Sequence, residues 1–224
     1  MNFDWTVIVS NAKFLLLQGL VGIGAYGGGT LRLAIPAILL GFVVGIILGL
    51  ARMADRPWIH YPAVLYIELI RGVPLVIVIF WFWFLVPVMI GRPVPEYWVA
   101  LTAFAMFEGA YIGEIIRAGI QSVPKGQVEA ATASGLNYFQ MMRHVIFPQA
   151  LKRMLPPLGN EFIQLLKASS LVSTIAMVEL TRTAQLIASA TFRPMELLVG
   201  AALIYLAMNL ILSFSLGRLE SRLV

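Results

Sequence analysis

The sequence contains no cysteine and only two histidines, and just 12% of its 224 residues are charged. Without cysteine the chain forms no disulfide and offers no thiolate for catalysis or metal binding. Its histidines, His60 and His144, lie far apart in the sequence, so we expect no metal site. Soluble domains carry about 25% charged residues, so this chain has too little polar surface to face water on all sides.

Motifs that would indicate an ATP-binding enzyme or a secreted precursor are also missing. The sequence has no G-x-x-x-x-G-K-[ST] loop, so we do not expect it to bind ATP in the usual way. Its first residues, MNFDWTVIVSN, lack the basic segment and the small-residue cleavage site of a removable signal peptide. Lys and Arg outnumber Asp and Glu by 16 to 11, but they mostly flank apolar runs. That distribution is typical of membrane topology and not of nucleic-acid binding.

Apolar residues dominate instead, with 60% hydrophobic residues and a mean hydropathy of +0.88. Several runs reach the ~20 residues that a helix needs to cross the hydrocarbon core of a bilayer. We therefore predict an all-α polytopic membrane protein in which residues 1–224 form a single transmembrane domain. Residues 1–28 are expected to form a short interfacial helix and a turn. The five expected spans lie at about 31–50, 63–90, 97–118, 158–180 and 195–216.

The first two spans carry local features with a structural interpretation. Gly41, Gly45 and Gly49 recur every four residues and share one helix face, which lets another backbone approach closely. The RGVP sequence at residues 71–74 predicts a kink in the second span, near its aqueous end. Glu68 and Arg71 are three residues apart, so they are placed to pair on one side of that helix.

Polar side chains at mid-depth are the candidates for a substrate pathway. Glu108 lies near the middle of the third span, where a carboxylate usually marks a cavity or a pathway. In the fourth span Asn160, Gln164 and Lys167 share one helix face, which must look toward the bundle interior or water. We expect Glu108 and Lys167 to share a cavity, although a structural partner would explain Glu108 equally well. The candidate pathway residues are Arg71, Glu108, Gln164, Lys167 and Ser170.

Residues 129–148, EAATASGLNYFQMMRHVIFP, form the one long segment that cannot lie in lipid. Ser122 and Pro124 are placed to begin a short helix just before it. Gly135 ends that helix, because glycine accepts a left-handed conformation at low cost. The helix is too short to be stable alone, so we expect it to dock into a groove of another protein.

A second helix is predicted to follow, so that residues 119–157 form a helix–turn–helix elbow. Asn137 and Gln140 have the spacing of a capping box, which would open this helix. Pro148 is expected to kink it, and the adjacent Pro156 and Pro157 to stop it.

The distribution of Lys and Arg predicts the orientation in the membrane. Five spans place the loops at 51–62 and 119–157 and the C-terminus on one side. These segments hold more basic residues than the segments on the other side. The elbow and the C-terminus are therefore predicted to be cytoplasmic and the N-terminus external.

The elbow resembles the EAA---G---------I-LP signature of permease subunits of ATP-binding-cassette (ABC) importers. The matching residues are Glu129, Ala130, Ala131, Gly135 and Pro148. Val145 and Phe147 replace the Ile and Leu of the signature, apolar for apolar. Further blocks resemble the polar-amino-acid branch of that family and extend the likeness over nearly the whole chain. They are IRGVPL at 70–75, GEIIRAGIQSVPKGQVEAA at 113–131 and PQALKRMLPPLGNEFIQLLKASSL at 148–171.

The resemblance implies a transport subunit and not an enzyme. In that family the helix around residues 129–135 is a coupling helix, which sits in a cleft of a separate ATPase subunit. Glu129 would then provide a charged anchor, Ala130 and Ala131 close packing, and Gly135 the turn. ATP and Mg²⁺ would bind to the ATPase, and no cofactor is expected in this chain.

The resemblance also implies a larger assembly in the bacterial cytoplasmic (inner) membrane. Its parts are a second copy of this permease or a homologous permease, two ATPase subunits and an extracytoplasmic amino-acid-binding protein. Membrane lipid surrounds it, and no nucleic acid takes part. The implied substrate is a polar amino acid, and the VPLVIVIFWFWFLVP block favours glutamate or aspartate.

Two other functions remain as alternatives at the level of sequence. An ion-coupled secondary amino acid carrier would use Glu108 and Lys167 directly, but it leaves the elbow unexplained. Internal repeats would favour a carrier, and the sequence shows no convincing repeat. A purely structural membrane scaffold is weakened by the polar residues at mid-depth.

Overall fold

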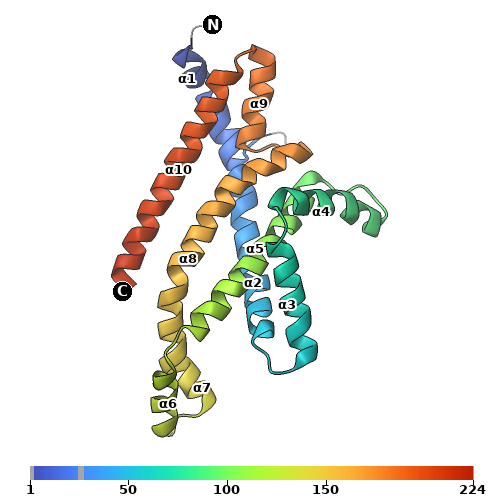
Figure 1. Ribbon diagram of the computed structural model, residues 1–224. Coiled ribbons are helices and arrows are strands. Elements are labelled where there is room, and N and C mark those ends of the chain that lie inside the picture. The colour runs from blue at the N-terminus through green and yellow to red at the C-terminus, as the bar shows by residue number, and fades with distance from the viewer. Residues whose placement is uncertain (1–2, 25–27, 224) are drawn as a thin grey trace.

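The computed structural model describes residues 3–24 and 28–223, and its regular structure there is entirely helical (Figure 1). This confirms the predicted all-α fold class. The elements in chain order are α1 (Trp5–Phe14), η1 (Leu15–Val21), α2 (Thr30–Arg52), α3 (Pro57–Arg71), α4 (Leu75–Ile90), α5 (Glu96–Gln121), α6 (Lys125–Ala133), α7 (Tyr138–Met141), η2 (Met142–Ile146), α8 (Phe147–Ala168), η3 (Ser169–Ile175), α9 (Leu180–Thr191) and α10 (Pro194–Leu223).

Three of the described helices, α2, α5 and α10, are by themselves long and apolar enough to cross a membrane. Two bent helix pairs also qualify if each pair is counted as one span, which gives up to five. The first pair is α3 and α4, whose axes differ by 110°. The kink predicted at residues 71–74 is therefore present, and it is sharp enough that α4 extends to the side of the molecule (Figure 1). Gly72 caps α3, and Pro74 precedes α4 without a backbone N–H to continue the helix.

The second bent pair includes the region of the fourth expected span, at 158–180. Helix α8 begins at Phe147 and continues through Pro156 and Pro157 to Ala168, so the prediction that these prolines stop the helix is wrong. Burial of Met154, Gly159 and Leu165 along α8 outweighs the local cost of the prolines, because tertiary packing overrides helix propensity. The chain then forms η3 and passes through Ala176, at φ 62°, before α9 leaves at a bend of 47°.

Helices α2 and α5 pack backbone to backbone along the predicted glycine face. A Cβ on Gly45 would lie 2.6 Å from Ile112 Cγ2, and a Cβ on Gly49 would lie 2.7 Å from the Gly113 carbonyl oxygen. Gly41 lies equally close to Glu108, at 2.7 Å from a built Cβ to the glutamate Cβ. The α2–α5 pair is therefore the rigid centre against which α3, α4 and α8 are arranged.

A buried carboxylate, that of Glu179, connects α9 to α10 by hydrogen bonds in the part of the molecule away from α6 and α7. Glu179 caps α9 by accepting hydrogen bonds from the Thr181 and Arg182 N–H groups at 2.9 and 2.7 Å. It also accepts a 2.7 Å hydrogen bond from the hydroxyl of Tyr205 in α10. Thr30, at the start of α2, accepts a 3.4 Å hydrogen bond from the Leu180 N–H. These bonds hold the starts of α2 and α9 against α10.

Replacing Tyr205 with Phe should lower the stability of the protein by about 2 kcal/mol, because a buried carboxylate loses a charge-assisted hydrogen bond. The measurement is the melting temperature of the purified protein in detergent. Tyr97→Phe is the matched control. The Tyr97 hydroxyl donates a 3.0 Å hydrogen bond at the surface, to the backbone carbonyl of Arg32, which carries no charge. Equal shifts in the two variants would contradict the importance of the Glu179 contact.

Candidate coupling elbow and translocation cavity

Helices α6 and α7 form the predicted elbow at one end of the molecule, opposite the N-terminus (Figure 1). Pro124 is the N-cap of α6, whereas Ser122 caps the end of α5 instead of opening α6. Gly135 follows the helix at φ 75°, which confirms the left-handed turn. The capping box is also confirmed, with Gln140 N–H to Asn137 Oδ1 at 2.9 Å and Asn137 N–H to Gln140 Oε1 at 3.0 Å.

The residues of the signature divide between the surface and the interior of the elbow. Glu129, Ala130 and Gly135 are exposed, as a docking role requires. Ala131 is only 5% exposed, so it packs inside the elbow rather than toward a partner. Pro148 is exposed at the start of α8.

Sequence reasoning missed two aromatic residues on the outside of the elbow. Tyr138 and Phe139 are 71% and 70% exposed and directly follow the capping residue Asn137. Two adjacent aromatic residues in an otherwise polar segment were the available signal, because exposed aromatic side chains are enriched in interfaces.

An ion-pair network joins the three helices α2, α3 and α5. Arg52 of α2 contacts Glu68 of α3 at 2.6 Å and Glu114 of α5 at 3.1 Å. Glu114 also pairs with Arg117 one turn further along α5. The expected pair between Glu68 and Arg71 is therefore not formed, because Glu68 pairs with Arg52 instead. Arg71 instead lies over the ring of Tyr111, 5.3 Å from its centroid.

A cavity of about 500 Å³ opens between α5, α8 and the end of α3. Cationic and anionic side chains line it together with Tyr111 and Asn160: the cations are Arg71 and Arg153, and the anions are Glu114 and Glu161. Gly119 and Ser122 also line it, so the cavity reaches the point where α5 leads into the elbow. Its charges of both signs are complementary to the ammonium and carboxylate groups of an amino acid.

The other predicted pathway residues do not line this cavity. Glu108 is 1% exposed, and its Oε2 has no hydrogen-bond partner among the described residues. Gln164 and Lys167 are exposed on α8, and Ser170 donates a 2.8 Å hydrogen bond to the Lys167 carbonyl. The expected pairing of Glu108 with Lys167 in one cavity is therefore not seen within this chain.

Glu161 is the pathway candidate that sequence reasoning missed. It lines the cavity between α5 and α8 and is partly buried there. Its position next to Asn160, in a polar stripe of the fourth predicted span, was the signal that could have identified it.

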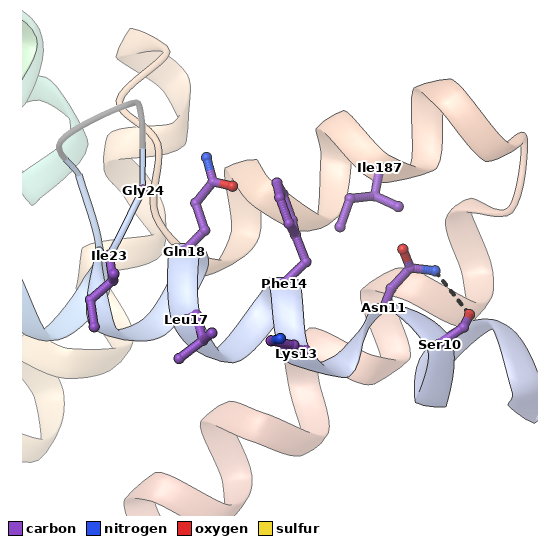
Figure 2. A pocket seen from close by; sticks show the side chains of 9 residues that line it. All are labelled: Ser10, Asn11, Lys13, Phe14, Leu17, Gln18, Ile23, Gly24 and Ile187. Carbon is purple, nitrogen blue, oxygen red and sulfur yellow. Dashed lines mark hydrogen bonds between the residues drawn. The ribbon is translucent and has the colours of Figure 1, made fainter.

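A second cavity, of about 800 Å³, lies near the opposite end of the molecule (Figure 2). Asn11, Phe14 and Gln18 point into it from α1 and η1, toward Ile187 of α9. None of the predicted pathway residues lines it. Within residues 3–24 and 28–223, no group of three or more His, Asp or Glu side chains is arranged to hold a metal ion.

The family model for "Binding-protein-dependent transport system inner membrane component" matches residues 41–224. The chain belongs to this family. The resemblance inferred from the elbow signature is thereby confirmed. The chain is an integral inner-membrane protein of a binding-protein-dependent transport system, and the assignment disfavours the ion-coupled carrier and the structural scaffold.

Individual relatives cover almost all of this permease. It is 42% identical over 198 residues to the "Probable glutamine ABC transporter permease protein GlnP" of Bacillus subtilis (strain 168), covering 86% of this chain and 89% of the relative. It is 35% identical over 224 residues to the "Arginine transport system permease protein ArtQ" of the same organism, covering 100% and 98%.

A solved structure titled "Crystal structure of an amino acid ABC transporter with histidines" matches with a TM-score of 0.90 and 38% identity, covering 99% of this chain and 100% of that chain. The permease is therefore a subunit of an amino acid ABC transporter. The two relatives are named for glutamine and arginine, and not for the glutamate or aspartate that we favoured from the sequence.

Proposed function

We propose that this permease forms half of the translocation pathway of an ATP-driven importer for a polar amino acid, and that its elbow docks onto a separate ATPase subunit. The observation that carries the coupling proposal is the position of α6 at the extreme end of the molecule (Figure 1). There Glu129 and Ala130 are exposed while Ala131 anchors the helix from within. A short helix held in this way presents a rigid surface to a groove in a partner.

The elbow lies in the cytoplasm in this proposal, with the N-terminus outside and the C-terminus inside. The α2–α3 turn and the elbow lie toward the same end of the molecule, and the N-terminus toward the other (Figure 1). The excess of basic residues in these segments supports a cytoplasmic location for that end. An ATPase in the cytoplasm would then reach α6 directly.

A second permease, either identical or homologous, completes the pathway. Gln164 and Lys167 are exposed along α8 in a single chain. A cation and an amide at that depth are unfavourable against lipid, so this face of α8 is best covered by another permease and a shared aqueous path. An extracytoplasmic binding protein would deliver the amino acid to the outer end.

The cavity next to the elbow supports an amino acid as the substrate. Arg71 is placed to meet a carboxylate, and Glu161 an ammonium group. The relatives named for glutamine and arginine support a polar side chain on the substrate. Buried Glu108, one turn before the cavity-lining Tyr111 on α5, would extend the polar path beyond this cavity.

Replacing Gly135 with Asp should leave the permease in the membrane and abolish co-purification of the ATPase subunit. A residue at φ 75° with no atom near its Cβ position can carry a side chain only by projecting it outward, into the proposed docking surface. Co-purification of the tagged permease with its ATPase is the measurement.

Gly135→Asn is the matched control, because asparagine tolerates the left-handed conformation and adds no charge. It should retain the ATPase better than the Asp variant does. Unchanged co-purification with Gly135→Asp would show that the docking surface is elsewhere.

A further inference from the structure

The elbow is joined to α8 by a turn of unusual width. In η2 the chain is a π-helix, and the Phe147 N–H donates to the Met142 carbonyl, five residues back instead of four. Such a turn holds one residue more than an α-helical turn. One extra residue rotates the preceding part of the chain, which includes the elbow, by about 100° around the helix axis. The width of η2 therefore sets the direction in which the elbow points.

The extra residue decides which side chains of the elbow face the protein. Ile146 and Ala150 are buried on one face of the helix. If the preceding turn were regular α-helix, this buried face would continue at a position between Met142 and Arg143. With the wide turn, Met141 and Met142 pack with Val128 of α6 against the buried cluster, while Arg143 stays exposed. A regular turn would carry Arg143 toward that apolar cluster.

Helix α8 is fixed against α5 just beyond this turn. A Cβ on Gly119 of α5 would lie 2.1 Å from Met154 Cγ, so the two helices are in close contact there. The Arg153 guanidinium also donates to the Ser122 carbonyl, at the end of α5. Any change in the width of η2 must therefore move the elbow and not α8.

Pro148 lies at a position where a proline disfavours a regular α-helical turn. It has no N–H to donate to the His144 carbonyl four residues back, and its ring would clash with that carbonyl in a regular α-helix. The Gln149 side-chain amide donates to the Val145 carbonyl at 3.0 Å and to Gln127 Oε1 of α6 at 3.4 Å. Proline alone does not create a wide turn, because α8 passes Pro156 and Pro157 without one. The packing of Met141 and Met142 requires the extra residue, and Pro148 disfavours the regular alternative.

We infer that Pro148 is a positioning residue, which keeps η2 wide and so fixes the direction in which α6 presents Glu129 and Ala130. Its consequence for transport rests on the proposed docking of α6 to an ATPase. The rotational setting itself is a property of the permease chain alone, and it is open to direct measurement.

Cross-linking within the full-length permease in membranes tests this setting, because the natural chain has no cysteine. Gln127→Cys and Gln149→Cys introduce a thiol on each side of the α6–α8 contact, and a short bismaleimide should join them efficiently. Adding Pro148→Ala should abolish most of this cross-linking, because the turn relaxes and the elbow rotates. Deleting the exposed residue His144 in that variant should restore cross-linking. The deletion removes the extra residue, so a regular α-helical turn would then return the elbow to its original orientation on α8.

Pro157→Ala in the same double-cysteine background is the matched control, and it should cross-link as the parent does. Undiminished cross-linking with Pro148→Ala, or no recovery after deletion of His144, would overturn the positioning role. Co-purification of the ATPase with the same variants tests docking separately. Cross-linking that changes as expected while co-purification stays constant would support the positioning role and contradict the docking proposal.

Discussion

Replacing Gly45 with Val should lower the stability of the permease by about 3 kcal/mol, the upper part of the range for overpacked cores. The added side chain would begin 2.6 Å from Ile112 Cγ2 and 3.1 Å from the Gly113 backbone nitrogen. The backbone at Gly113 cannot move aside without separating α2 from α5. The measurement is the melting temperature of the detergent-solubilised protein, together with its yield in the membrane.

Gly217→Val provides the matched control on α10. Gly217 is exposed, and no atom lies within 4 Å of its Cβ position. The same chemical change should therefore alter the melting temperature little. A Gly45→Val protein as stable as the Gly217→Val protein would show that the α2–α5 contact is not the rigid centre of the fold.

Replacing Glu108 with Gln should lower amino acid uptake by about tenfold or more while the protein stays folded. A tenfold loss corresponds to about 1.4 kcal/mol of lost stabilisation along the transport path. The side chain is 1% exposed, and one of its oxygens has no hydrogen-bond partner among the described residues. A group held at such a cost in the membrane is usually functional. Uptake by the complete transporter in proteoliposomes is the measurement.

The melting temperature separates a transport role for Glu108 from a structural one. If the carboxyl group serves transport, its amide should leave the melting temperature unchanged, because glutamine keeps the size of the side chain and Oε2 has no hydrogen bond to lose among the described residues. Glu96→Gln, in the first turn of the same helix, is the matched control and should keep full uptake. A destabilised Glu108→Gln protein with normal uptake would assign Glu108 a structural role.

Local signals in the sequence were sufficient wherever the residues that shape an element lie within a few positions of one another. The spacing of Gly41, Gly45 and Gly49 predicted a close helix contact, and the structure places all three against α5. Asn137 with Gln140 predicted a capping box, and Gly135 a left-handed turn, and both are present. In each case the residue types and their spacing determine the local turn or the helix face on which they lie.

Predictions of partners across the fold were less successful. Glu68 was expected to pair with Arg71 in its own helix, but it pairs with Arg52 of α2. Ala131 was assigned to docking, but it is buried within the elbow. Lys167 was expected to share a cavity with Glu108, but it is exposed on α8. In each case the decisive neighbour belongs to another helix, and nothing in the local sequence specifies which side chains of two packed helices will meet.

The sequence by itself determined that this protein is an all-α membrane permease with a polar elbow, because composition, apolar run length and a spaced motif are properties of the chain alone. Only the tertiary structure decided the size of the bend between α3 and α4, 110°, the cavity beside the elbow and the rotation of the elbow on α8. Those features depend on how helices distant in sequence pack together. The same packing keeps α8 helical through Pro156 and Pro157, and it stabilises the π-helical turn η2 that precedes Pro148.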